Sequence, residues 1–185
     1  MFLDSLKNFQ WYNEPANVCF VEDGMLVETE PNTDFWQNVS HNIHKDNGHF
    51  FYISKISDFS MIVKWRFDKA VASDQCGLMV RVDVNNWAKI SLLSPDINKY
   101  QIGCVVTNSG NSDWSSMPID VVPSVLWFKI IRRAKDFMLF VSLDGKSYNM
   151  IRMFSFFHAD DVIKVGAYAC SPQNHNFKCV LEDIF

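Results

Sequence analysis

A period-two alternation of apolar and polar residues recurs along this chain and constrains its fold more than any other feature. Successive side chains of a β-strand point to opposite faces, so the alternation predicts strands that bury one face. Several short strands separated by turn residues are typical of an all-β sandwich or barrel. The segments that show the pattern are residues 77–83, 87–93, 101–107, 127–133, 137–143 and 162–169.

Turn residues separate these segments and fix their length. Asp-Gly and Asn-Gly pairs tolerate the positive φ angles of hairpin turns. Residues 137–143, the pair Asp144-Gly145 and residues 148–153 therefore predict a β-hairpin. No long segment has apolar residues at helical spacing with caps, so helices are not expected. The texture is uniform, without linker or repeat, and 185 residues suit one domain, which we expect to span 1–185. Further turn signals are Glu22-Asp23-Gly24, Asp46-Asn47-Gly48 and Asn108-Ser109-Gly110.

Charge and cysteine usage narrow the class of protein. Lys and Arg number 17 against 21 Asp and Glu, which excludes a strongly basic surface and makes nucleic acid an unexpected partner. The start of the chain lacks a signal-peptide pattern, and no apolar run reaches the roughly 20 residues of a membrane span. The five cysteines form no Cys-x-x-Cys pair. They fit reduced, buried thiols, so we expect a cytoplasmic protein, and we interpret the sequon Asn38-Val39-Ser40 as coincidental.

Alternation also sorts three successive strands into two faces. One face is apolar and, in a sandwich, forms the core between the sheets; it carries Cys76, Leu78, Val80, Val82, Ala88, Ile90, Leu92, Ile102, Cys104 and Val106. The other face mixes polar groups with an aromatic ring, and we expect it to be exposed. It is either a groove for a polar ligand or an ordinary solvated sheet face. Its residues are Gln75, Gly77, Met79, Arg81, Trp87, Lys89, Ser91, Gln101, Gly103, Val105 and Thr107.

An ordered set of short segments resembles a known family along nearly the whole chain. The segments are Thr33-Asp34-Phe35-Trp36, Asp74 to Arg81, Trp87-Ala88-Lys89, Val105-Val106-Thr107, Ser112-Asp113-Trp114-Ser115, Asp144-Gly145 with Arg152, and Val165-Gly166 leading to Ser171-Pro172, preceded by Phe9, Trp11 and Pro15. The chain resembles the concanavalin A-like family of uncharacterised domains that includes the regulation-of-enolase proteins and relatives named β-xylosidase-like. The resemblance implies a jelly-roll sandwich of two antiparallel sheets with a concave face. It implies no established activity.

One departure from the family pattern concerns function. Where relatives carry Gly and Glu after the Trp-x-Lys segment, this chain has Ser91 and Leu93. If that carboxylate binds or catalyses in relatives, this chain has lost it.

Glycoside hydrolysis needs two carboxyl groups beside the scissile bond. Concanavalin A-like glucanases supply theirs as Glu-x-Asp-x-(x)-Glu on one strand, but no glutamate lies between Pro31 and Leu181. An enzyme would have to use aspartates such as Asp34, Asp74 and Asp113, which can equally tie loops through local hydrogen bonds. The β-xylosidase-like name is interpreted as an accessory sandwich domain, because this chain is too short to hold a propeller hydrolase.

Metal and nucleotide chemistry find little support. His41 and His44, with His49 nearby, lack the third or fourth ligand and the supporting helix or hairpin that a zinc site usually has. We expect them to be surface loop residues. Gly145-Lys146-Ser147 lacks the glycine that a phosphate loop requires, because Phe140 stands in that position. Cysteines on an apolar strand face are expected to be inert. We therefore expect no cofactor, no metal and no catalytic residue.

A binding module is the remaining prediction. Sugar binders stack an indole ring on the sugar and place hydrogen-bonding groups beside it. The candidate ligand-binding residues are Trp36, Gln75, Arg81, Trp87, Lys89, Thr107, Asp113 and Trp114. We expect a non-catalytic module for a carbohydrate or sugar-derived metabolite, and Arg81 with Lys89 also admits an anionic sugar. The alternatives are a glycoside hydrolase acting through aspartates and a regulatory protein-interaction domain.

Overall fold

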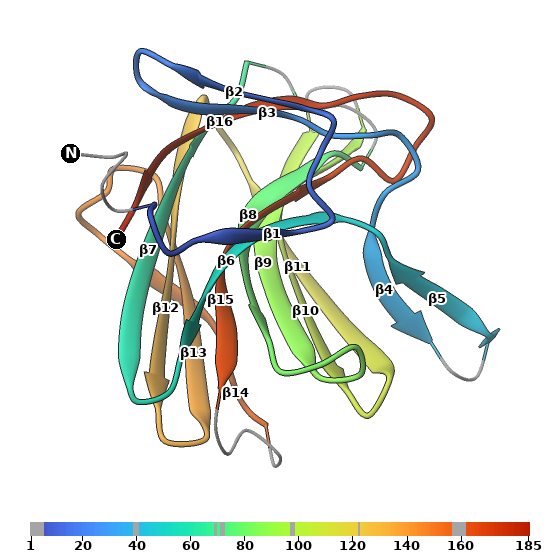
Figure 1. Cartoon of the computed structure of the whole chain (residues 1–185), viewed down its shortest axis with the longest axis vertical. Helices are drawn as coiled ribbons and strands as arrows, with labels where there is room; N and C mark the ends of the chain where they lie inside the picture. Colours follow the sequence, from blue (N-terminus) through green and yellow to red (C-terminus); the bar gives the residue numbers. More distant parts are fainter. Residues whose placement is uncertain are drawn as a thin grey trace.

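Two antiparallel β-sheets face each other in the computed structural model (Figure 1). It describes residues 6–38, 41–68, 70, 73–96, 99–121, 123–156 and 162–185. Within these ranges the chain forms sixteen strands and no α-helix, as the alternation predicts. None of the described residues belongs to a helix with the length and apolar character needed to cross a membrane.

The first sheet has nine strands and curls strongly. Their order is β1 (Gln10–Tyr12), β6 (His49–Lys55), β15 (Ile163–Cys170), β8 (Gln75–Arg81), β9 (Trp87–Asp96), β10 (Lys99–Asn108), β11 (Asn111–Ile119), β4 (Phe35–Asn38) and β5 (Ile43–Asp46). The curl brings the two ends of the sheet together. Tyr12, at the end of β1, donates a hydrogen bond of 2.6 Å from its hydroxyl to Oδ2 of Asp46, at the end of β5.

The second sheet has seven strands and closes the other side of the sandwich. Their order is β14 (Asn149–Ser155), β13 (Asp136–Ser142), β12 (Val125–Arg133), β7 (Phe59–Arg66), β16 (Lys178–Ile184), β3 (Gly24–Glu28) and β2 (Asn17–Val21). The hairpin predicted around Asp144-Gly145 is confirmed, because β13 pairs with β14 across this turn.

The core between the sheets contains the apolar face that the alternation predicted. Leu78, Ile90 and Ile102 from the nine-stranded sheet are fully buried there. Phe128 and Leu139 from the seven-stranded sheet belong to the same cluster. The prediction that this face forms the inter-sheet core is confirmed.

The opposite, concave face of the nine-stranded sheet is not the exposed face that the sequence suggested. Most of it is buried in a second apolar cluster, which comprises Phe35, Phe50, Tyr52, Met79, Trp87, Val105, Tyr168 and Cys170. The hairpin β4–β5 covers this face, because the ring of Phe35 lies against those of Trp87 and Tyr168. The expectation failed because the covering residues come from a distant part of the chain.

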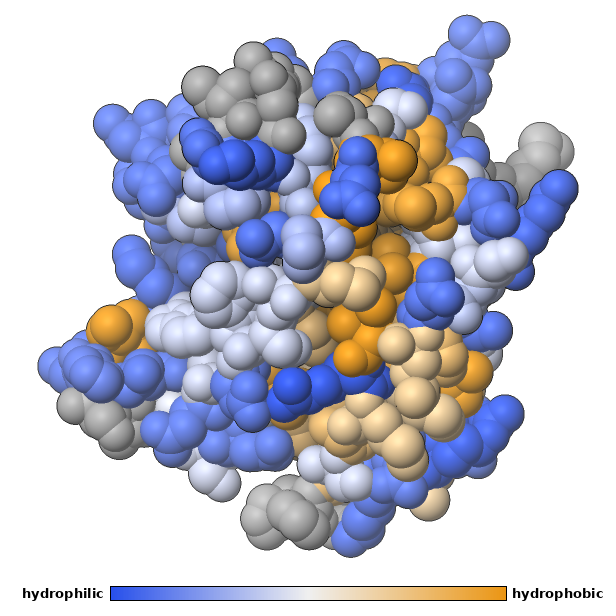
Figure 2. Space-filling model, turned by 180° about the vertical axis from the view of Figure 1, so that it is seen from behind, coloured by the Kyte–Doolittle hydropathy of each residue, from blue (hydrophilic) through white to orange (hydrophobic). Residues whose placement is uncertain are grey.

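Part of the outer surface is apolar. Figure 2 shows hydrophobic surface gathered on the half of the rear face where β12 and β13 lie, with hydrophilic groups on the other half. The exposed large apolar side chains of the described residues include Met117, Val121, Leu143, Met150 and Met153.

Candidate functional site

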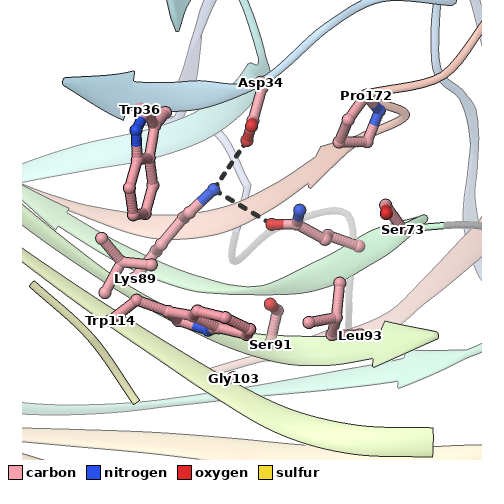
Figure 3. A pocket seen from close by; sticks show the side chains of 11 residues that line it. Asp34, Trp36, Ser73, Lys89, Ser91, Leu93, Gly103, Trp114 and Pro172 are labelled. Carbon is pink, nitrogen blue, oxygen red and sulfur yellow. Dashed lines mark hydrogen bonds and ion pairs between the residues drawn. The ribbon is translucent and has the colours of Figure 1, made fainter. Parts of the chain in front are cut away.

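A pocket opens on the concave face of the nine-stranded sheet, between the sheet and the start of β4 (Figure 3). Its cavity volume is about 180 Å³, which is smaller than the roughly 300–1,000 Å³ of drug-sized sites and suits a small ligand. Strands β8, β9, β10 and β11 and the start of β4 supply most of its wall. The lining residues are Asp34, Trp36, Ser73, Gln75, Lys89, Ser91, Leu93, Gly103, Val105, Trp114 and Pro172.

A buried ion pair forms one wall of the pocket. The ammonium of Lys89 lies 2.8 Å from Oδ1 of Asp34 and 3.0 Å from Oε1 of Gln75. Only 4% of the Lys89 side chain is exposed. A buried charge needs a partner, and the carboxylate and the amide oxygen supply it here. The pair ties β9 to the residue that precedes β4, as the dashed lines in Figure 3 show.

Two buried side chains donate further hydrogen bonds to Gln75 and Asp34. The Tyr168 hydroxyl donates to Oε1 of Gln75 at 3.3 Å, and the Cys170 thiol donates to Oδ1 of Asp34 at 3.7 Å. Burial raises the pKa of Tyr168 well above its usual value. Burial, together with the Asp34 charge, does the same to the pKa of Cys170. Both groups therefore keep their protons at neutral pH and act as donors.

Two tryptophans and a glycine shape the open part of the pocket. Trp36 projects from β4 and Trp114 from β11, and Figure 3 shows them on either side of the Lys89 side chain. Trp114 is 51% exposed. Gly103 lies on β10 next to Trp114, where an added Cβ would come within 3.4 Å of Nε1 of Trp114 and 3.8 Å of Leu93. The missing side chain leaves the floor open.

Three polar groups of the pocket have no hydrogen-bond partner among the described residues. Asp34 uses only Oδ1, which leaves Oδ2 as an acceptor. Gln75 uses only Oε1, which leaves the two N–H donors of Nε2. The indole N–H of Trp114 is a third such group. The pocket therefore offers both donors and an acceptor to a ligand.

The structure brings four of the eight predicted ligand-binding residues to this pocket and places the other four elsewhere. Trp36, Gln75, Lys89 and Trp114 line it. The residues outside its lining are Arg81, Trp87, Thr107 and Asp113. Thr107 is fully buried, with its hydroxyl 2.7 Å from that of Ser112. Asp113 is largely exposed and pairs with Arg152 at 3.0 Å.

Two of these placements have a common physical cause, which is the cover formed by β4 and β5. Trp87 has no exposed surface, because it packs in the second apolar cluster, so its ring is not available for stacking. Arg81 is buried and its guanidinium binds Asp46 with both terminal nitrogens, at 2.6 and 2.9 Å. Arg81 also lies 4.6 Å from the ring centre of Tyr12.

The three aspartates considered for hydrolysis lie in different environments. Asp34 is the one carboxylate among the described lining residues of the pocket. Asp74 is 1% exposed and accepts hydrogen bonds of 2.7 Å from the Ser171 hydroxyl and from Nε2 of His175. Asp113 faces solvent beside Arg152.

The histidines near residue 44 point to separate partners. His41 lies near Asn38, and Nδ1 of His44 lies 2.6 Å from Oε1 of Gln37. His49 is buried between Asn13 and Glu30, so it is not the surface residue that was expected. No group of three metal-ligating side chains occurs within the described ranges. The sequon falls partly on residues 39 and 40, which lie outside those ranges.

Sequence reasoning did not select several lining residues, although a signal existed for some. Ser91, Gly103 and Val105 share the alternation parity of Lys89 and so belong to the same face. Ser91 and Leu93 are the two departures from the family pattern, and both line the pocket. Ser73 and Pro172 come from connecting segments, where no periodicity marks them.

The family described as "Protein of unknown function (DUF1349)" matches residues 11–185, and the chain belongs to it. The chain is 30% identical over 178 residues to Regulation of enolase protein 1 of Saccharomyces cerevisiae (strain ATCC 204508 / S288c), which covers 96% of this chain and 88% of that protein. The resemblance stated from the sequence is thereby confirmed.

Solved structures give the same fold. A crystal structure of a functionally unknown protein from Saccharomyces cerevisiae has a TM-score of 0.89 and 28% identity, covering 97% of this chain and 96% of that one. The GH43 protein BlXynB from Bacillus licheniformis has a TM-score of 0.74 and 16% identity. It matches 96% of this chain, which spans 36% of the BlXynB chain. That likeness shows the fold alone.

Proposed function

We propose that this protein is a non-catalytic binding module whose ligand, a carbohydrate or sugar-derived small molecule, lies in the pocket beside Trp36 and Trp114. The observation that carries the proposal is the combination of two indole rings with unpartnered donors and an acceptor at one pocket. Sugars present flat C–H faces for stacking and hydroxyls that both donate and accept.

The shape of the floor supports a ring-shaped ligand. Gly103 leaves room beside the Trp114 indole, next to Leu93. A flat, partly apolar ring stacked on the Trp114 indole would present its hydroxyls to Nε2 of Gln75 and Oδ2 of Asp34. The GH43 neighbours share only the fold with this chain.

The carboxylate content of the pocket weighs against the hydrolase alternative. Hydrolysis with two carboxyl groups needs one as acid and one as nucleophile or base. Asp34 is the one carboxylate among the described lining residues, and its Oδ1 accepts a hydrogen bond from Lys89. Released product in the assay below would reverse this part of the proposal.

We also place the protein in the cytoplasm. Its five cysteines are all free, and four of them are buried. Free thiols suit a reducing compartment. Imaging of a tagged full-length chain in its own cells tests this location, and a signal in the secretory pathway would overturn it.

Tryptophan fluorescence tests the binding function. We would titrate the protein with neutral mono- and oligosaccharides and assay each mixture for product. A saturable change without product, weakened about tenfold or more by Trp114→Ala, supports the module. Trp127→Ala is the matched control, because Trp127 is a partly exposed indole of β12 outside the pocket. No response to any sugar would overturn the proposal.

A regulatory protein-interaction domain is the second candidate, and one observation favours it. The apolar outer surface in Figure 2 is of the kind that binds protein partners. The yeast relative is named for regulation of enolase. Purified enolase assayed with and without this protein gives a direct test. An unchanged enolase rate over a wide range of added protein would count against this candidate.

A further inference from the structure

We propose that the ligand of this pocket is an uncharged polyhydroxy ring, and that the buried Asp34–Lys89 pair makes the pocket reject phosphorylated and acidic sugars. The proposal rests on the proposed function and names its ligand class. It differs from the prediction made from the sequence, in which Arg81 and Lys89 could also bind an anionic sugar.

The charges that line the pocket cancel. Asp34 and Lys89 are the charged side chains among the described lining residues, and they lie 2.8 Å apart. The remaining lining residues are neutral. An anion that leaves water for such a site meets no net positive charge to offset its desolvation.

Lys89 is not available to a second anion. Its ammonium contacts Asp34 and Oε1 of Gln75, and the rings of Trp87 and Tyr168 lie 5.9 and 5.5 Å from it. With 4% of the side chain exposed, its positive charge is directed into the protein. A phosphate would have to displace the carboxylate of Asp34 to reach it.

A second cation of the concave face is equally engaged. Arg81 lies outside the pocket lining, with 5% of its side chain exposed, and binds both oxygens of Asp46. The two cations that alternation placed on this face are therefore each matched with an aspartate. One aspartate precedes β4 and the other ends β5.

The unpartnered groups suit hydroxyls. Oδ2 of Asp34 accepts, whereas Nε2 of Gln75 and the Trp114 indole donate. A neutral hydroxyl can serve either kind of group. A phosphate or carboxylate can only accept, and it would be repelled by the Asp34 carboxylate, 21% of which is exposed. A cationic amine would meet the ammonium of Lys89 close behind that carboxylate.

Calorimetric titration with matched sugars tests the ligand class. The probes are glucose, galactose and xylose against glucose 6-phosphate, galacturonate and glucosamine. We expect at least one neutral sugar to bind about tenfold or more tightly than its charged counterpart. Its affinity should not change between about 0.02 and 0.2 M salt, because an uncharged ligand has no screened attraction to lose.

A charge variant tests the role of the ion pair. Asp34→Asn removes the carboxylate and leaves Lys89 without its counter-ion, so galacturonate or glucose 6-phosphate should gain about tenfold in affinity. Asp113→Asn is the control, because Asp113 is a largely exposed carboxylate that pairs with Arg152 outside the pocket. Circular dichroism confirms that each variant folds. If Asp34→Asn does not fold, the wild-type panel and its salt series decide alone.

The outcomes separate this inference from the proposed function. Tighter binding of a charged sugar by the wild-type protein would overturn the uncharged ligand and leave the sugar-binding module intact. Binding of no sugar, neutral or charged, would overturn the binding function and this inference with it. A neutral ligand whose affinity Asp34→Asn leaves unchanged, with no gain for anions, would remove the role given to the pair.

Discussion

At the scale of single residues, the buried thiols show how the fold sets chemistry. Cys76, Cys104, Cys170 and Cys179 are buried, whereas Cys19 is exposed on β2. Burial raises the pKa of Cys104 to about 12 and raises those of Cys170 and Cys179 well above the usual value. Since the thiolate is the reactive form, such thiols are unreactive near neutral pH.

A thiol count checks this prediction. We expect an aromatic disulfide reagent at about pH 8 to modify Cys19 alone in the native protein, because Cys19 is exposed and the other four thiols are buried. All five thiols should react once the chain is unfolded in denaturant. Mass spectrometry of the digested native sample identifies the site. Fast modification of Cys170 would show that the pocket wall opens far more than its burial indicates.

Asp144 gives a prediction about acid stability. Its carboxylate accepts hydrogen bonds from the backbone N–H groups of Ser147 and Lys146 and from the Ser142 hydroxyl, which lower its pKa from 3.8 to about 2. A carboxyl group whose pKa is lower in the folded than in the unfolded state stabilises the fold at pH values above its unfolded-state pKa. This stabilisation is lost as the pH falls through the folded-state pKa. The wild type should therefore exceed Asp144→Asn in stability above about pH 4, and the difference should shrink towards pH 2. Denaturant unfolding at several pH values measures it, and a difference independent of pH would contradict the prediction.

At the scale of elements, side chains rather than strand pairing position the hairpin β4–β5. Its only register pair with β11 in the described residues is Asn38 with Asn111. Asp34 and Asp46, at its two outer ends, bind Lys89 and Arg81. Between them, Phe35 is fully buried in the second apolar cluster.

The anchoring role of Phe35 is testable. Phe35→Ala should lower the free energy of unfolding by about 3–5 kcal/mol, the usual cost of removing a buried phenyl ring. It should also weaken ligand binding, because Trp36 follows on the same strand and lines the pocket. Phe20→Ala is the control, since Phe20 is 58% exposed on β2. Equal losses in the two variants would show that Phe35 does not anchor the hairpin.

Two glycines on the concave face permit the curl of the sheet, and a third opens the pocket. An added Cβ at Gly77 would lie 2.0 Å from the carbonyl oxygen of Ile90, and one at Gly166 would lie 2.0 Å from that of Phe51. Neighbouring backbones approach that closely only where a side chain is missing, which is how glycine serves in a bent sheet. At Gly103 an added Cβ would make only ordinary van der Waals contacts, at 3.4 Å to Trp114 and 3.8 Å to Leu93.

Alanine substitutions should separate these roles. Gly77→Ala should destabilise the protein by about 1–3 kcal/mol or more, because backbone must move. Gly103→Ala should leave stability within about 1 kcal/mol of the wild type. It should nevertheless weaken ligand binding, since its methyl group would fill part of the floor beside Trp114. Denaturant midpoints and titrations of both variants give the comparison, and full ligand affinity in Gly103→Ala would place the ligand elsewhere.

The alternation of apolar and polar residues predicted the features that depend on neighbouring residues alone, namely where strands lie and which side chains share a face. The alternation in residues 77–83, 87–93 and 101–107 located three strands and sorted both faces correctly. It could not show what covers the concave face, because Phe35 and Trp36 reach that face through tertiary contacts and not through a pattern in their own short strand. Trp87 and Trp114 look equivalent in sequence, yet the hairpin buries only Trp87.

At the scale of the whole molecule, the nine-stranded sheet is shared by two apolar clusters. Its one face contributes to the core against the seven-stranded sheet, and its other face contributes to the cluster under β4–β5. The pocket lies at the edge of the second cluster, since Trp36 packs against that cluster and also lines the pocket. A ligand there contacts both the sheet and its cover.

Ligand binding should therefore stabilise the molecule unevenly. A ligand that binds only the folded state adds about 2.7 kcal/mol of stability at a concentration 100 times its Kd, with a higher melting temperature. Strands β4 and β5 have limited pairing with the sheet, so the free energy of local opening should be lower for them than for central strands. A ligand that bridges Trp36 and Trp114 should therefore slow the hydrogen exchange of the β4 and β5 amides most. Exchange measured by mass spectrometry with and without a saturating neutral sugar checks this, with β12 and β13 of the opposite sheet as the internal reference. Slower exchange confined to β12 and β13 would move the binding site to the outer face of the other sheet, and the pocket would then be an unoccupied feature of the fold.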